Sequence, residues 1–123
     1  MLEYLSKEWI EEADAALRAS GLCAPDGHRF AVQQQVGEVM FHMVFDGEGA
    51  RVSSGPAPDP EVVFSQTRET AVAIAKGELS AEEAVLNGEV TFEGDPMALL
   101  SHRRLLARAE DIFAEVRGRT AWN

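Results

Sequence analysis

The chain has 123 residues, of which 46% are hydrophobic, and it carries 21 acidic and 11 basic side chains, which gives a net charge of −10. This negative field repels phosphate groups, so nucleic acids and anionic membrane surfaces are not expected partners. No apolar run approaches the roughly 20 residues that span a bilayer, which argues against integral membrane insertion. Size and composition predict one folded domain over residues 1–123, and the lone cysteine, Cys23, fits a cytoplasmic location.

The first half of the chain predicts one helix followed by strands. Ser6 is a suitable N-cap for a helix over residues 7–19, whose apolar side chains recur at helical spacing. After it come segments in which apolar and polar residues alternate, separated by turn-forming and proline-rich segments. Four strands are predicted in this part, at residues 30–36, 39–45, 51–54 and 61–65.

The second half predicts mostly helix. Two short helices at residues 68–76 and 81–87 lead into a strand at 89–93. Asp95 and Pro96 are typical of a helix start, and the long final helix that follows is expected to break near Ser101. The whole order predicts an α+β fold with one sheet and helices on one side. One apolar stripe runs along the final helix, formed by Leu99, His102, Leu106, Ala109, Phe113 and Val116.

Residues with catalytic or metal-binding chemistry are few and scattered. The histidines His28, His42 and His102 lie far apart and match no metal-ligand spacing, so each is expected to be a hydrogen-bonded structural residue. Cys23 has no basic neighbour in sequence that would activate its thiol, so a reactive thiolate is not expected. No catalytic residue, metal ligand or cofactor is therefore predicted. For the arginines of the final helix, surface ion pairs are expected and contact with an acidic head group is the alternative: Arg103, Arg104 and Arg108.

Residues 61–100 carry a succession of elements that resembles a known family. A short apolar strand ends at Ser65-Gln66-Thr67, and an alanine-rich helix follows and stops at Gly77. A second short helix runs from Ser80 to Gly88, and the next strand ends at Gly94-Asp95. This order and spacing is similar to the sterol carrier protein-2 (SCP2-like) lipid-binding domain, in which a Ser-led helix occupies the first of these helical positions.

The resemblance implies a mostly antiparallel five-stranded sheet covered by helices, enclosing a hydrophobic tunnel. It also implies a non-enzymatic protein whose partner is a hydrophobic small molecule, namely a sterol, fatty acid or fatty acyl-CoA. Residues carried over by position as cavity lining are Val63, Ile74, Leu79, Val85, Val90, Phe92, Met97 and Leu100. Large side chains on one face of the second strand, and two on the final helix, are added as ligand contacts: Phe41, Met43, Phe45, Leu106 and Phe113.

If the final helix is a lid over the tunnel, His102 and Arg103 lie at its edge, where an anionic head group would meet a cation. Two other functions stay open. One is an accessory or dimerisation module with a filled core, which would form a homodimer through the final helix. The other is a cone-shaped α+β isomerase or dehydratase, for which the chain offers His42, His102 and Tyr4 as acid or base.

Overall fold

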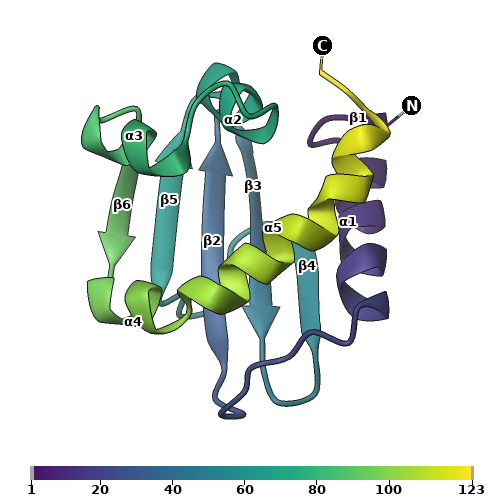
Figure 1. Ribbon diagram of the computed structural model, residues 1–123, viewed down its shortest axis with the longest axis vertical. Coiled ribbons are helices and arrows are strands. Elements are labelled where there is room, and N and C mark those ends of the chain that lie inside the picture. Colours follow the sequence, from purple (N-terminus) through teal and green to yellow (C-terminus); the bar gives the residue numbers. More distant parts are fainter. Residues whose placement is uncertain (1, 123) are drawn as a thin grey trace.

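The computed structural model describes residues 2–122, which form an α+β fold (Figure 1). In chain order the elements are β1 (Leu2–Glu3), α1 (Lys7–Ala19), β2 (Phe30–Val36), β3 (Val39–Phe45), β4 (Ala50–Ser54), β5 (Val62–Gln66), α2 (Arg68–Ala75), α3 (Ala81–Leu86), β6 (Val90–Gly94), α4 (Pro96–Ser101), α5 (Arg103–Gly118) and β7 (Thr120–Ala121). The elements expected from the sequence are all present, and their ends differ from expectation by a few residues at most. The final helix does break, at His102, into α4 and α5.

The main sheet has five strands in the order β4-β3-β2-β5-β6. Every neighbouring pair is antiparallel except β2 and β5, which are parallel. The expected mostly antiparallel five-stranded sheet is therefore confirmed. A second, two-stranded sheet was not foreseen: β1 and β7 pair in parallel and join the two ends of the chain.

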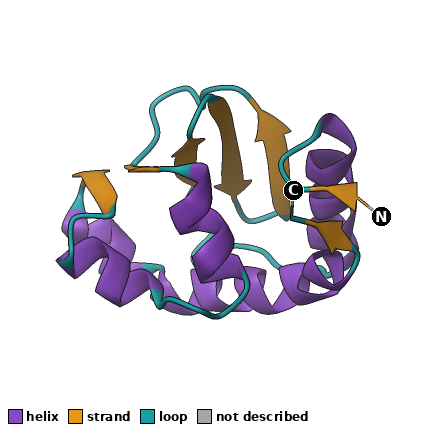
Figure 2. Cartoon of the chain, turned by 90° about the horizontal axis from the view of Figure 1, so that it is seen from above, coloured by secondary structure: helices purple, strands orange, loops and turns teal. Residues whose placement is uncertain are grey.

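The helices cover one face of the main sheet. Figure 2 shows α2 to α5 on one side of the strands, with α1 flanking the sheet at its β4 edge. The Asp14 carboxylate of α1 accepts a hydrogen bond of 2.7 Å from the backbone N–H of Val52 in β4. This contact satisfies a donor on an edge strand that would otherwise face solvent.

Strand register decides which side chains face the helices. Val52, Met43, Val32 and Val62 lie opposite one another across four strands, and all are buried. Because side chains alternate along a strand, Val63 points to the opposite face of the sheet, which the helices do not cover and which is called the open face below.

The filled part of the core lies between α1, α5 and the β4-β3-β2 half of the sheet. The largest fully buried side chains, all in this region except Val62 of β5, are Phe30, Phe45, Leu17, Val32, Val62 and Val116. Trp9 of α1 donates from Nε1 to Thr120 Oγ1 at 3.0 Å, and that hydroxyl donates to the Val116 carbonyl at 2.6 Å. This buried chain of hydrogen bonds, with the β1–β7 pairing, holds the two ends of the protein together.

Candidate ligand-binding region

The β5–β6 half of the sheet is less completely covered than the other half. Phe64 and Phe92 lie opposite each other on β5 and β6, with ring centroids 5.7 Å apart, and both remain half-buried. Of the short helices above them, α2 buries only Ala71, α3 buries only Ala84, and α4 buries no residue. Apolar surface on the helix-covered face therefore remains accessible here, which is where a hydrophobic ligand would gain most from desolvation.

An open depression of about 380 Å³ lies between α2 and Trp122. Its lining combines apolar side chains with a few charged ones: Arg68, Glu69, Val72, Ala73, Glu78 and Trp122. Val72 also packs, half-buried, against the hydrophobic core. The depression thus connects solvent with the apolar side of α2.

A run of aromatic rings leads from the depression towards the sheet. Trp122 packs on Tyr4 with ring centroids 4.9 Å apart, and Tyr4 meets Trp9 edge-on at 5.1 Å. Trp9 in turn lies 6.3 Å from Phe41 on β3. Burial raises the pKa of Tyr4 to about 12, with a smaller contribution from the negative charge of Glu110. Its phenol is therefore neutral at physiological pH.

The rim of the depression carries charges of both signs. The Arg68 guanidinium lies 5.4 Å from the centre of the Tyr4 ring and donates to the Tyr4 carbonyl at 3.3 Å. Glu69 and Glu78 are the acidic lining residues, and Glu78 lies 3.9 Å from the Lys76 ammonium. With the Lys76 ammonium included, the two carboxylates are matched by two cations, so the rim carries no net charge.

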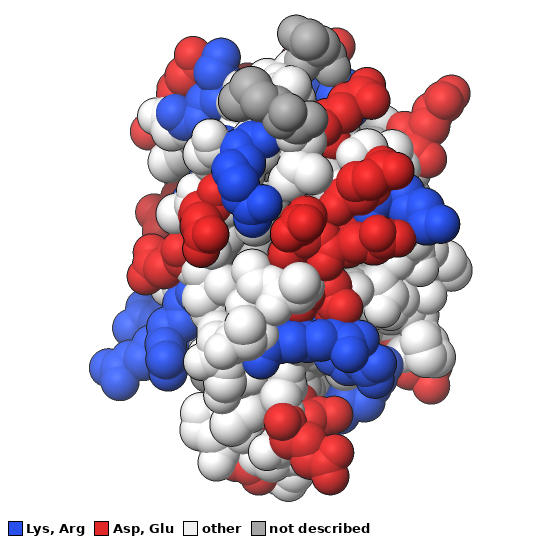
Figure 3. All heavy atoms as spheres, turned by 90° about the vertical axis from the view of Figure 1, so that its right-hand side faces the viewer, with Lys and Arg blue, Asp and Glu red and all other residues white. Residues whose placement is uncertain are grey.

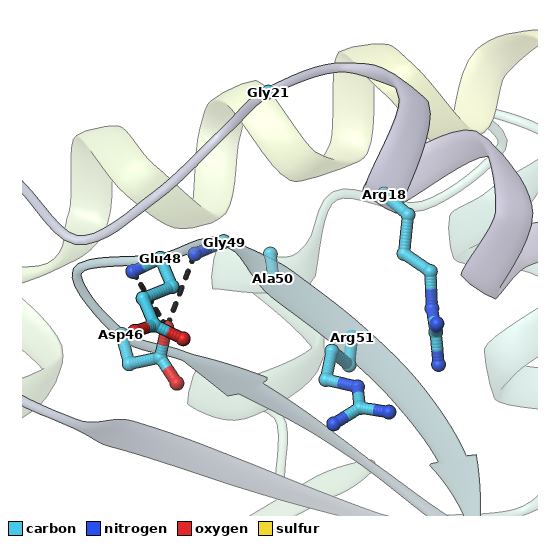
Figure 4. A pocket seen from close by; sticks show the side chains of 7 residues that line it. All are labelled: Arg18, Gly21, Asp46, Glu48, Gly49, Ala50 and Arg51. Atoms are coloured by element: carbon cyan, nitrogen blue, oxygen red, sulfur yellow. Dashed lines mark hydrogen bonds between the residues drawn. The ribbon is translucent and has the colours of Figure 1, made fainter.

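A second depression, of about 270 Å³, lies at the β3–β4 turn (Figure 4). Its lining is polar, and the side chains of Arg18 and Asp46 already have local partners. The Asp46 carboxylate accepts from the backbone N–H of Glu48 at 2.8 Å and of Gly49 at 3.1 Å, which stabilises the turn. Arg18 pairs with Asp14 at 2.8 Å. These contacts explain Asp46 and Arg18 through turn and helix structure.

The residues predicted as ligand contacts fall in four environments, and none of them lines either depression. Four are buried: Met43, Phe45, Val90 and Phe113. Five are half-buried: Phe41, Ile74, Leu79, Phe92 and Leu106. Three are largely exposed: Val85, Met97 and Leu100.

The fourth environment is the far side of the sheet, where Val63 lies beside Gln33 of β2 and Glu93 of β6. Val63 therefore does not lie on the helix-covered face, whereas its strand neighbours Val62 and Phe64 do. The resemblance matched the strand correctly, but a one-residue difference in alternation moves a side chain to the opposite face.

The proposed head-group residues lie at the α4–α5 junction, at the opposite end of the sheet from α2 (Figure 1). His102 stacks flat on the buried Phe30 ring, with centroids 3.9 Å apart, and its Nδ1 donates to the Ala98 carbonyl at 2.7 Å. Only Nε2 of that ring remains for a ligand. Arg103 is exposed beside it.

The two histidines considered as acid or base for an enzymatic function do not lie in one site. His42 occupies the open face of the sheet and donates from Nδ1 to the Gly55 carbonyl at 2.8 Å. His102 stacks on the helix-covered face, so the sheet separates the two imidazoles. Within residues 2–122, no group of three His, Cys, Asp or Glu side chains is arranged to hold a metal ion.

Sequence reasoning missed the residues that form the α2 depression. Val72 belongs to the apolar run of α2, and Arg68 begins that helix just after its N-cap, Thr67. The cap is thus Thr67, whereas the family pattern suggested a serine. Trp122 lies far away in sequence and reaches the site because β7 pairs with β1. In the sequence, the one feature that could have pointed to this site was the large aromatic side chain of Trp122 close to the end of the chain.

Comparison with known proteins identifies the family. The model of the SCP-2 sterol transfer family matches residues 8–107, so the chain belongs to that family. A search of curated protein sequences finds no significant match. In the described part of the chain, no helix is both long and apolar enough to cross a bilayer.

Solved structures share the fold. A crystal structure of sterol carrier protein 2 is 15% identical, with a TM-score of 0.63 over 92% of this chain and 98% of that one. A conserved hypothetical protein from Thermus thermophilus, described as possibly a sterol carrier protein, is 17% identical, with a TM-score of 0.62 over 94% and 91% of the two chains. The sec-alkylsulfatase Pisa1 from Pseudomonas sp. is 16% identical, with a TM-score of 0.57 over 85% of this chain. This chain spans only 15% of the sulfatase.

Proposed function

We propose that this protein binds a hydrophobic small molecule and carries it without chemical change. Membership of the SCP-2 sterol transfer family supports this function. The observations that carry the proposal are the incompletely covered apolar surface of the β5–β6 half of the sheet and the open depression beside α2. The candidate ligand classes are sterols, fatty acids and fatty acyl-CoA.

Among these classes, we favour a ligand with an uncharged polar end at the α2 depression. Burial of an acyl chain or ring system would supply the affinity, at about 0.8 kcal/mol per buried methylene. The polar end would stay near the rim, because burying it without a partner is unfavourable. The charges of Glu69, Glu78, Arg68 and the adjacent Lys76 sum to zero, so the rim offers no net attraction to a carboxylate or phosphate.

The backbone carbonyl partners of His42 and His102 support a non-catalytic role, since those hydrogen bonds hold both rings in structural positions. The dimerisation alternative receives less support. The final helix buries Leu105, Ala109, Phe113 and Val116 inside its own chain. A homodimer would have to form through a different surface.

The test is a pair of matched valine substitutions on opposite sides of the sheet. Val72→Glu places a charge at the depression, whereas Val63→Glu places the same charge on the open face. Binding of hexadecanol and hexadecanoate, which share a chain and differ in head group, is measured by native mass spectrometry. We expect Val72→Glu to weaken hexadecanol binding at least roughly tenfold, since one buried charge costs well over the 1.4 kcal/mol that a tenfold change represents.

Val63→Glu should leave binding within about twofold, a change of under 1 kcal/mol. Hexadecanol should bind the unmodified protein more tightly than hexadecanoate. If neither ligand, nor a sterol, binds below roughly millimolar concentration, which corresponds to only about −4 kcal/mol, the carrier function is refuted. Equal losses in the two valine variants would refute the α2 location.

A further inference from the structure

The two edges of the main sheet are treated differently by the rest of the chain. At one edge, α1 lies against β4, and Asp14 accepts a hydrogen bond from the Val52 backbone N–H. Figure 3 shows that α1 side of the molecule, where acidic and basic side chains lie intermixed. At the other edge, β6 is the last strand of the sheet, and within residues 2–122 only β5 pairs with it. The sheet can therefore be extended at β6.

The hydrogen-bond pattern shows which backbone groups of β6 point outwards. Asp95, just after β6, donates its N–H to the Glu61 carbonyl at 3.1 Å. Hydrogen-bonded and non-hydrogen-bonded pairs alternate along an antiparallel ladder. Glu93 therefore directs its N–H and C=O to β5, whereas Phe92 and Val90 direct theirs away from the sheet. The strand contains neither lysine nor proline, the residues that commonly protect a sheet edge.

The large exposed hydrophobic residues of the described chain all belong to the helices next to β6. They are Val85 and Leu86 of α3, which are 44% and 85% exposed, and Met97 and Leu100 of α4, which are 65% and 60% exposed. α3 contacts β6 and ends shortly before it, and α4 begins directly after it. In Figure 1, α3 lies at the upper end of β6 and α4 at its lower end. Apolar side chains are thus exposed to water at both ends of the free strand edge.

We propose that β6 pairs antiparallel with β6 of a second copy of this chain, so that the two five-stranded sheets form one continuous sheet. A two-fold axis at Phe92 places that residue opposite its own copy, with Val90 opposite Gly94. Opposed residues of a ladder share a face, so the helices of both copies lie on the same side of the joined sheet. Thr91 then lies opposite Glu93 on the open face, and no two like charges are directly opposed within the strands.

The order of the elements makes a second copy the partner that fits this edge. Because α3 precedes β6 and α4 follows it, antiparallel pairing brings α3 of each copy to the strand end where α4 of the other copy lies. Leu86 and Met97, the most exposed residues of the two helices, then face each other at both ends of the interface. Their contact removes apolar surface from water twice in one dimer. A single extended peptide would pair with β6 but would leave these side chains in water.

The inference goes beyond the proposed ligand binding, and self-association is measured on ligand-free protein so that each can fail alone. In sedimentation velocity, the unmodified protein should change from monomer to dimer between about 1 μM and 1 mM, a range in which modest interfaces associate. Added salt should tighten the dimer, because each copy carries a net charge of −10 and ions screen the repulsion. Glu89 of one copy and Asp95 of the other adjoin just beyond the strand ends, which adds to that repulsion.

Two substitutions at the apolar ends test the arrangement by rescue. Leu86→Lys or Met97→Glu alone should weaken self-association at least about tenfold, because each places a charge against an apolar side chain at both ends of the interface. The two variants mixed should associate at least about tenfold more tightly than either alone, since opposite charges meet at one end and the other end keeps its native contact. The matched control is Leu86→Lys mixed with Met97→Lys, which brings like charges together and should show no such gain. Rescue by mixing cannot arise from misfolded variants.

Engineered cysteines test the strand register, in a chain that also carries Cys23→Ser. Thr91 and Glu93 of opposite copies form a non-hydrogen-bonded pair, whose Cα atoms lie about 4.5 Å apart, a separation that a disulfide spans. Thr91→Cys mixed with Glu93→Cys should therefore form disulfide-linked dimers at least roughly tenfold faster than a control mixture does. The control is Arg51→Cys mixed with Ser53→Cys, two exposed positions on the other edge strand, β4.

A monomer at every protein concentration would overturn the proposal. So would equal rates of disulfide formation in the two cysteine mixtures. If the protein does associate but the mixed Leu86→Lys and Met97→Glu variants show no gain, the copies pair through another surface and the assignment to β6 is wrong.

Discussion

Replacement of Gly94 by alanine should destabilise the protein by about 3 kcal/mol or more, the range of severe backbone strain combined with a steric clash. Gly94 adopts a φ of +123°, which side-chain-bearing residues rarely tolerate. An added Cβ would collide with the Glu61 carbonyl oxygen and lie 3.0 Å from Val62 Cα. Neither strand can move aside easily, because Gly94 pairs with Val62 across β5 and β6.

The matched control is Gly88→Ala, at the end of α3. Gly88 also has a positive φ, of +78°, but an added Cβ there would meet open space. We expect a loss of about 1 kcal/mol, from backbone strain alone. Urea denaturation measures both variants. Equal losses would show that close packing of β6 on β5 is not what requires glycine at position 94.

Phe30→Ala should cost about 3 to 5 kcal/mol, as expected for removal of a fully buried aromatic side chain. Its ring is 0% exposed, stacks on His102 at 3.9 Å and lies 6.3 Å from Phe45. The substitution would therefore leave a cavity between the sheet and the α4–α5 junction. The free energy of unfolding from chemical denaturation is the measurement.

Phe92→Ala provides the comparison, because Phe92 is half-buried in the incompletely covered half of the sheet. We expect it to cost less than half as much stability as Phe30→Ala, since less apolar area leaves contact with protein. It should weaken hydrophobic ligand binding, which Phe30→Ala should affect only through stability. If Phe92→Ala destabilised the chain as much as Phe30→Ala, this part of the core would be as tightly filled as the rest.

Local sequence signals predicted most of the fold because they act over a few residues. The Ser6, Ser80 and Asp95 side chains do cap helices, each accepting a hydrogen bond from a backbone N–H in the first turn. Alternation in residues 30–45 placed the two longest strands correctly. The strands β1 and β7 were missed because two residues cannot display an alternating pattern.

The site was less predictable, because it depends on how completely each helix covers the sheet. Alternation indicated that Met43 and Phe45 face the helices, but not that both would be almost completely buried. The α2 depression joins Arg68 with Trp122, which the β1–β7 pairing brings together. No local pattern encodes that long-range contact.

The most direct test of the central claim is to map where a hydrophobic ligand lies. A long-chain alcohol carrying a photoactivatable diazirine near the end of its chain is bound, irradiated and located by mass spectrometry of peptides. We predict adducts on α2, on β5 and β6 around Phe64 and Phe92, and on Trp122. Adducts confined to the open face around Val63, or to the filled core between α1 and β4, would contradict the account.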